Sequence, residues 1–198
     1  MKQQIKSALA VSTSLGIVAG LVLLPTTVDA ANTTTVNAVV SKVASVATTS
    51  GTVNLAINPT AAGSYTSASD TVTAGTNSAT GYQLQISAAT TALTNGGNTI
   101  VASSLTPATA GPLTVNKWGY RVDNGAGTFG AGTTSAQTDA ASLTSTLWAG
   151  VTSSAVTIKS TSSANSADVT TVWYGASADF TKPNGTYTTS VTYTGLAN

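Results

Sequence analysis

The sequence contains no cysteine, no histidine and no glutamate in its 198 residues, and only 7% of the residues are charged. Without cysteine the chain has no disulfide and no thiolate nucleophile. Without histidine it has no imidazole to activate a serine or to bind a metal ion. The composition therefore excludes cysteine- and histidine-dependent catalysis, and stability must come from an apolar core and a hydrogen-bonded backbone.

The chain is rich instead in small residues, with 39 Thr, 24 Ser and 32 Ala. Threonine and valine favour strands, because a branched β-carbon restricts the side chain in a helix and packs well on a pleated surface. The composition therefore favours an all-β fold.

The first thirty residues have the pattern of a secretory signal peptide. Lys2 and Lys6 precede the apolar residues 8–24, and Val28 and Ala30 occupy the small-residue positions before a cut after Ala30. We therefore expect residues 1–30 to be cleaved and the mature chain to be secreted. An uncleaved anchor is the alternative, although the apolar stretch is short for a spanning helix of about 20 residues.

The mature chain is close to neutral. Removing Lys2, Lys6 and Asp29 leaves equal numbers of basic and acidic side chains, and the basic ones are scattered along the sequence. Nucleic-acid binding depends on clustered Lys and Arg. We therefore expect no nucleic-acid partner, and no membrane span after signal cleavage.

Apolar residues recur mainly at every second position, which is the period of half-buried strands. Clusters of Gly, Asn, Asp, Pro and Ser separate these stretches. The pattern predicts one domain over residues 31–198, an antiparallel β-sandwich of about eight or nine strands that is Ig-like or jelly-roll-like. The clearest alternating stretches are residues 53–57, 82–86, 118–122, 156–158, 169–173 and 187–194.

Two segments are less regular. Residues 36–47 fit either strand or helix spacing, and we favour a strand because every later segment reads as β. Residues 124–146 are rich in Gly, Ala, Thr and Ser and predict a flexible loop, with room for a helical turn near residues 138–142.

Candidate catalytic groups are few. The mature carboxylates all lie in turn-like contexts, where Asx side chains bond the local backbone. We expect no enzyme activity, no cofactor and no metal site; an Asp-dependent glycan hydrolase is the minor alternative. These carboxylates are Asp70, Asp123, Asp139, Asp168 and Asp179.

One covalent modification is open to such a chain, an amide bond between a lysine and an asparagine assisted by a buried acid. Lys117, Lys159 or Lys182 can supply the amine. The alternative reading, surface lysines on strands, is favoured.

The aromatic residues fall into two predicted groups, residues of the core and residues that contact a ligand at the surface. Trp118 and Trp173 lie on alternating strands and are expected in the core, because each aromatic buries about 150–250 Å². Trp148 stands beside the predicted loop and is the better candidate for an exposed binding contact.

Residues 81–86 (GYQLQI) resemble the Gly-Trp-x-Leu segment of the WxL cell-surface domains of Gram-positive bacteria, and residues 185–194 are similar to that family's closing Gly-x-Tyr strand. The sequence departs from the family where Tyr82 and Tyr193 replace Trp and where Gly195 replaces the second Leu. The resemblance implies non-covalent attachment to the cell wall, with peptidoglycan as partner and Tyr82, Leu84 and Tyr193 at the matching positions. The alternative is that these are ordinary core residues of an exported sandwich.

We therefore expect a secreted, non-enzymatic bacterial surface protein that associates with the cell envelope by wall binding or adhesion. Its expected partners are peptidoglycan, another envelope glycan or another surface protein. The alternative is a pilin or fibre subunit, a homo-oligomer in which residues 31–46 pair with a neighbouring sheet edge.

Overall fold

The computed structural model describes residues 34–123 and 146–198. The chain divides into two units, Met1–Val39 and Val40–Asn198. Residues 34–39 belong to neither a helix nor a strand. The predicted signal peptide and nearly all of the predicted loop at 124–146 lie outside the described residues, and so does the side chain of Asp123.

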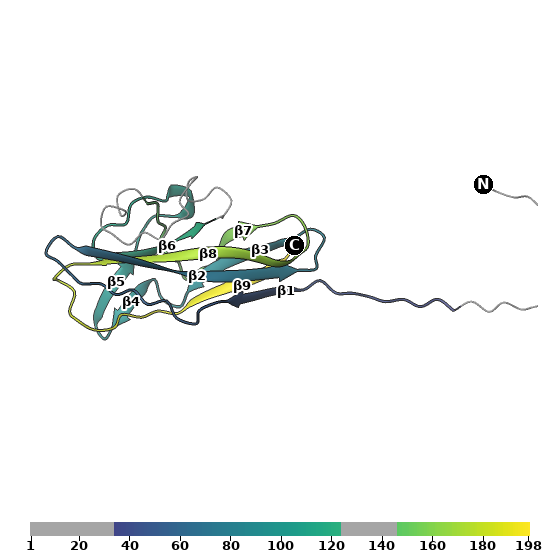
Figure 1. The fold of residues 1–198 in the computed structure, drawn as a ribbon, viewed down its shortest axis with the longest axis horizontal. Coiled ribbons are helices and arrows are strands. Elements are labelled where there is room, and N and C mark those ends of the chain that lie inside the picture. The colour runs from purple at the N-terminus through teal and green to yellow at the C-terminus, as the bar shows by residue number, and fades with distance from the viewer. Residues whose placement is uncertain (1–33, 124–145) are drawn as a thin grey trace, which may run out of the picture. The chain divides into compact units, whose positions relative to one another are not determined.

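The second unit consists of two β-sheets (Figure 1). The larger sheet has the order β1-β2-β8-β6-β5-β4 and the smaller sheet the order β7-β3-β9. The larger sheet contains β1 (Ala44–Thr48), β2 (Ser64–Thr76), β4 (Ala92–Asn95), β5 (Asn98–Ala102), β6 (Lys117–Asp123) and β8 (Asn165–Ala178). The smaller contains β3 (Tyr82–Ala88), β7 (Val156–Ser160) and β9 (Val191–Ala197).

These sheets confirm the predicted all-β sandwich. The described residues also contain one 3₁₀ turn, Pro107–Thr109. No helix among them has the length and hydrophobicity of a membrane span. The strands pair antiparallel except β5 and β6, which run parallel with Val101 opposite Lys117. An isolated parallel bridge also joins Thr60 to Asp179.

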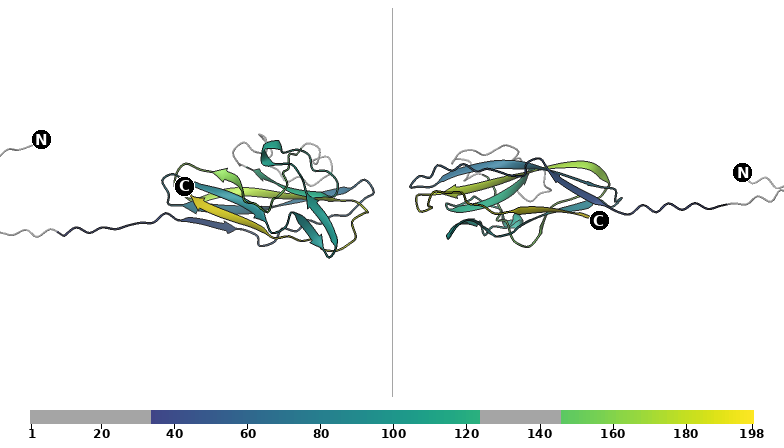
Figure 2. Two further views of the ribbon diagram at one scale, coloured as in Figure 1. Left: turned by 180° about the vertical axis from the view of Figure 1, so that it is seen from behind. Right: turned by 90° about the horizontal axis from the view of Figure 1, so that it is seen from below.

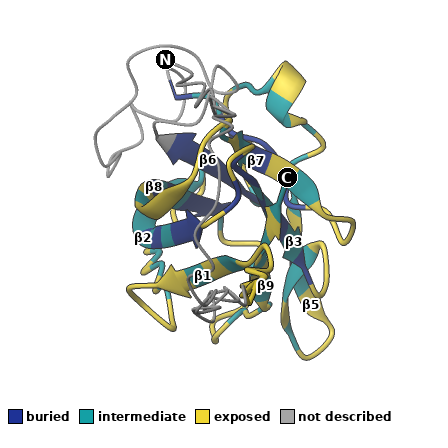
Figure 3. Ribbon diagram, turned by 90° about the vertical axis from the view of Figure 1, so that its right-hand side faces the viewer, coloured by how far each residue is buried: buried dark blue, intermediate teal, exposed yellow. Residues whose placement is uncertain are grey.

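The main core lies between the two sheets. Alternate residues of β2, β8 and β6 face alternate residues of β3, so each strand contributes every second side chain. Figure 3 shows buried residues concentrated in these strands, whereas β1 and β9 are half-buried or exposed. Trp118 is part of this core, as predicted; the other large members include Val72, Tyr82, Leu84, Ile86, Tyr120, Val172 and Tyr174.

A second, smaller cluster contains Tyr65, Leu113 and Trp148, with the half-buried Trp173 packed against it. The rings of Tyr65 and Trp148 meet edge to face, with 5.8 Å between centroids. Gly175 makes room for the indole, because a β-carbon there would lie 2.8 Å from Trp148 Cη2. Trp148 is 0% exposed, so the prediction that it is an exposed contact is wrong.

The irregular segment at 36–47 contains a strand only at its end. β1 begins at Ala44, and residues 34–43 form neither helix nor strand. The strand prediction is therefore confirmed for residues 44–47, and the helix alternative is wrong.

β1 is an edge strand of the larger sheet and lies beside β9 across the seam between the sheets (Figures 1 and 2). Gly195 of β9 faces β1, and a β-carbon at Gly195 would lie 2.7 Å from Val46 Cγ2. The two strands therefore approach closely only because residue 195 has no side chain.

Candidate functional site

A groove with a volume of about 1000 Å³ is lined by two extended segments, residues 50–59 and residues 182–191. We call these segments the first wall and the second wall. The predicted strands at 53–57 and 187–194 overlap them, yet the first wall is not a strand and β9 begins only at Val191.

The first wall has the side-chain pattern of a strand without its hydrogen bonds. Val53, Leu55 and Ile57 are half-buried and pack against the core, whereas Asn54 and Ala56 are exposed. Pairing with β2 ends with the bond from Thr49 N to Thr71 O (2.9 Å). Within the described part of the chain, residues 51–59 make no hydrogen bond to another backbone group.

The second wall is paired along one side. Thr188 exchanges two backbone hydrogen bonds with Thr94, both 3.0 Å, and Ser190 O accepts one from Ala89 N at 2.9 Å. Successive residues of an extended chain direct their backbone groups to opposite sides. The backbone groups of Tyr187 and Thr189 therefore face away from these partners, and they make no backbone hydrogen bond among residues 34–123 and 146–198.

The lining of the groove includes apolar and aromatic side chains of the core. Ile100, Trp118 and Tyr174 contribute to it from the larger sheet. Tyr193 of β9 also lines the groove, and its hydroxyl lies 2.6 Å from the hydroxyl of Tyr174. Burial raises the pKa of both tyrosines, so both stay protonated near neutral pH.

The groove lining contains few charged side chains that could take part in catalysis. Asp70 is the carboxylate among its lining residues, and its Oδ1 accepts a hydrogen bond from Ser50 N at 3.0 Å. Lys182 lines the groove as well, and its Nζ donates to Thr99 O at 2.7 Å. Glycoside hydrolysis uses two carboxyl groups, and the described lining residues of this groove supply one. In the residues that the structure describes, no cluster of metal-ligating side chains is present.

The structure does not bring the predicted contact residues to one surface. Tyr82 and Leu84 are 0% exposed within the core, and Trp148 belongs to the separate cluster with Tyr65. Only Tyr193 reaches the groove. A ligand can therefore not touch Tyr82, Leu84 or Trp148 in the folded chain.

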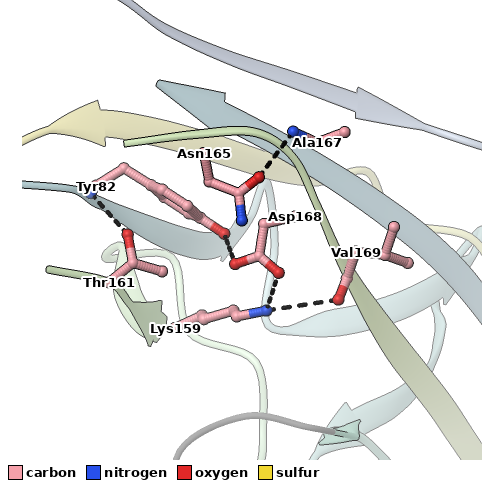
Figure 4. Close-up of polar contacts among 7 residues, drawn as sticks. All are labelled: Tyr82, Lys159, Thr161, Asn165, Ala167, Asp168 and Val169. Carbon is pink, nitrogen blue, oxygen red and sulfur yellow. Dashed lines mark hydrogen bonds and ion pairs between the residues drawn. The ribbon is translucent and has the colours of Figure 1, made fainter. Parts of the chain in front are cut away.

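Tyr82 instead anchors a polar network (Figure 4). Its hydroxyl donates to Asp168 Oδ2 at 2.7 Å, and Lys159 Nζ donates to Asp168 Oδ1 at 2.7 Å. The ion-pair side chains are only 13% (Lys159) and 19% (Asp168) exposed. Burial by itself raises the pKa of Asp168, but the hydrogen bonds from Lys159 and Tyr82 and the charge of Lys159 together hold it below its ordinary value.

This network bears on the predicted lysine–asparagine amide. Lys159 donates to a carboxylate and Lys182 to a backbone carbonyl, and neither donates to an asparagine side chain in the described residues. The amide bond stays a prediction that the intact mass would test, because each bond removes one ammonia.

The groove was not predicted because residues 53–57 and 187–194 were both expected to be paired strands. Gly51 and Pro59 mark the two ends of the first wall, and Pro183 and Gly185 lie in the predicted turn at the start of the second. Proline has no N–H for a ladder, and Gly185 has φ 141°, a conformation that glycine adopts readily.

Comparison with known proteins finds no relative of the chain. No protein family, no curated protein and no solved structure matches the chain. The resemblance to the WxL domains therefore stays a prediction.

Proposed function

We propose that the chain is an exported, non-enzymatic protein of the bacterial surface whose groove accepts an extended segment of another polypeptide. The observation that carries this proposal is the unpaired backbone of both walls beside an apolar groove lining. An extended peptide added to such an edge gains main-chain hydrogen bonds, and pockets for its alternate side chains provide specificity.

The energetics favour an occupant. Unpaired strand edges invite pairing with another chain unless charge, bulges or a covering segment blocks them. The first wall carries no charged residue between Gly51 and Pro59. Its alternate side chains already pack on the core, so an incoming strand needs little rearrangement of the wall.

The test uses the mature chain, residues 31–198, and a neutral synthetic peptide of alternating Thr and Val with Lys at both ends. We expect saturable binding and slower amide hydrogen exchange at residues 51–58, 187 and 189. Slower exchange confined to other segments, or no binding of any extended peptide, would contradict the proposal.

An envelope glycan is the second candidate for the same groove. Tyr187 and Tyr193 line it together with several threonine hydroxyls, and aromatic faces next to hydroxyls suit sugar rings. Sedimentation of residues 31–198 with isolated cell walls tests this. Binding that is lost in Tyr187→Ala, with an unchanged circular dichroism spectrum, would favour the glycan over the peptide. Tyr82→Ala is a poor probe, because Tyr82 is a core residue.

A further inference from the structure

We propose that the occupant of the groove is residues 34–43 of a second copy of this chain, so that copies join head to tail by donating a strand. This inference rests on the proposed function and names its partner.

The donor segment carries a concentration of exposed apolar side chains. Val36 is 87% exposed, Val39 92% and Val40 82%, and Val43 is exposed as well. Of the nine exposed large hydrophobic residues in the described part of the chain, these four lie within eight consecutive positions. Contiguous apolar surface of this kind marks interaction sites, because covering it stabilises by roughly 25 cal/mol per Å².

The donor segment also fits the groove in pattern and charge. When it is extended, Val36, Ala38 and Val40 lie on one side and Asn37, Val39 and Ser41 on the other. One side thus presents small and branched apolar groups to the aromatic groove lining. Residues 34–41 carry no charge, and the groove's own lining charges, Asp70 and Lys182, are of opposite sign.

The free length of the donor segment covers most of the first wall. Residues 41–43 are bonded to their own copy, so residues 34–40 are the part that can insert. At ~3.3 Å per residue they extend about 23 Å, against about 33 Å for the first wall, residues 50–59. A donated strand can therefore pair along about two thirds of the first wall.

Donation within one chain is disfavoured by how the end of the donor segment is held. The Asn77 side chain donates to Ser41 O at 2.9 Å and accepts from Val43 N at 2.8 Å, and Lys42 Nζ donates to Asn198 O at 3.0 Å. These residues precede β1, whereas the groove lining begins at Thr48, the last residue of β1. In its own chain, residues 41–43 are therefore held at the start of β1 and cannot enter the groove.

The contact between copies is heterologous, because the donor segment and the acceptor groove are different surfaces. Such contacts generate rings or open filaments. Each added copy brings one new groove and uses one, so a growing assembly keeps a free acceptor at one end and a free donor at the other.

The test compares two doubly substituted mature chains. Val36→Asp with Val40→Asp places two charges on the side predicted to face the groove. Asn37→Asp with Val39→Asp places two charges on the opposite side and is the matched control. All four residues lie outside the strands and are exposed, so both variants should fold. Sedimentation velocity should give concentration-dependent oligomers for the wild type and the control, and monomers for Val36→Asp with Val40→Asp.

A peptide of residues 34–43 separates this inference from the proposed function. Added to the monomeric variant, whose groove is free, the peptide should bind and slow amide exchange at residues 51–58. If the Thr–Val peptide binds and the 34–43 peptide does not, this inference is overturned and the proposed function stands. If neither binds, both are overturned. A wild type that is monomeric at every concentration would also overturn this inference.

Discussion

At the scale of single residues, the side chains that look like binding residues in the sequence hold the fold together. Tyr82 lies in the segment that resembles the WxL pattern, yet it is buried and its hydroxyl donates a hydrogen bond to Asp168. Trp148 stands next to a Gly- and Ala-rich segment, yet Gly175 leaves space that buries its indole. Burial of an aromatic depends on residues distant in sequence, so local composition did not reveal it.

The ion pair of Asp168 and Lys159 predicts a pH-dependent stability. The folded pKa of Asp168 is below its ordinary value of 3.8, so its stabilisation is present above that value and is lost as the pH falls through the folded pKa. Asp168→Asn should lower the free energy of unfolding at pH 7 by about 1.5–3 kcal/mol, the usual value of hydrogen bonds to charged groups. Urea titrations followed by tryptophan fluorescence should show the difference from the wild type shrinking below about pH 4. A difference that is constant down to pH 2 would exclude this role.

Gly195 gives a second prediction at this scale. Gly195→Leu places a β-carbon 2.7 Å from Val46 Cγ2. We expect a loss of about 1–3 kcal/mol in unfolding free energy from overpacking. Adding Val46→Ala should recover part of it, because that change removes the methyl group in conflict. Gly51→Ala is the control, since nothing lies within 4 Å of a β-carbon there; an equal loss in the control would refute the explanation.

At the scale of elements, periodicity predicted most strands but not their pairing. The stretches at 82–86, 118–122 and 169–173 became parts of β3, β6 and β8. The stretch at 53–57 has the same alternation and became an unpaired wall. Alternation reports which side chains are buried, whereas a strand also needs a neighbouring backbone, and only the assembled sheets decide that. The groove, which depends on this difference, was for the same reason not predictable from the sequence.

The difference between the first wall and a true strand predicts different hydrogen exchange. Amides of residues 53–57 should exchange far faster than those of residues 72–74 in β2, which pair on both sides with β1 and β8. Mass spectrometry of the monomeric Val36→Asp, Val40→Asp variant measures both segments in one experiment. Equal protection of the two segments would mean that the wall has a backbone partner in the free protein.

At the scale of the whole molecule, the order of strands in the sheets differs from their order in the chain. β2 lies between β1 and β8, and the nearest neighbours of β3 are β7 and β9. The longest ladder joins residues 64–76 to residues 165–178. In both sheets, the central strands therefore pair with strands that are distant in the sequence.

This strand order constrains when the chain can fold. In a polypeptide that emerges from its N-terminus, β1 and β2 can pair early. β2 must still wait for β8, and β3 for β7 and β9, which are partners at least seventy residues later. Until β8 and β9 have emerged, the early strands lack the partners that complete the two sheets, so the sandwich cannot close and the chain stays able to thread through a narrow channel. Closure of the sandwich is thereby postponed until β9 has emerged, a timing set by the sheet topology.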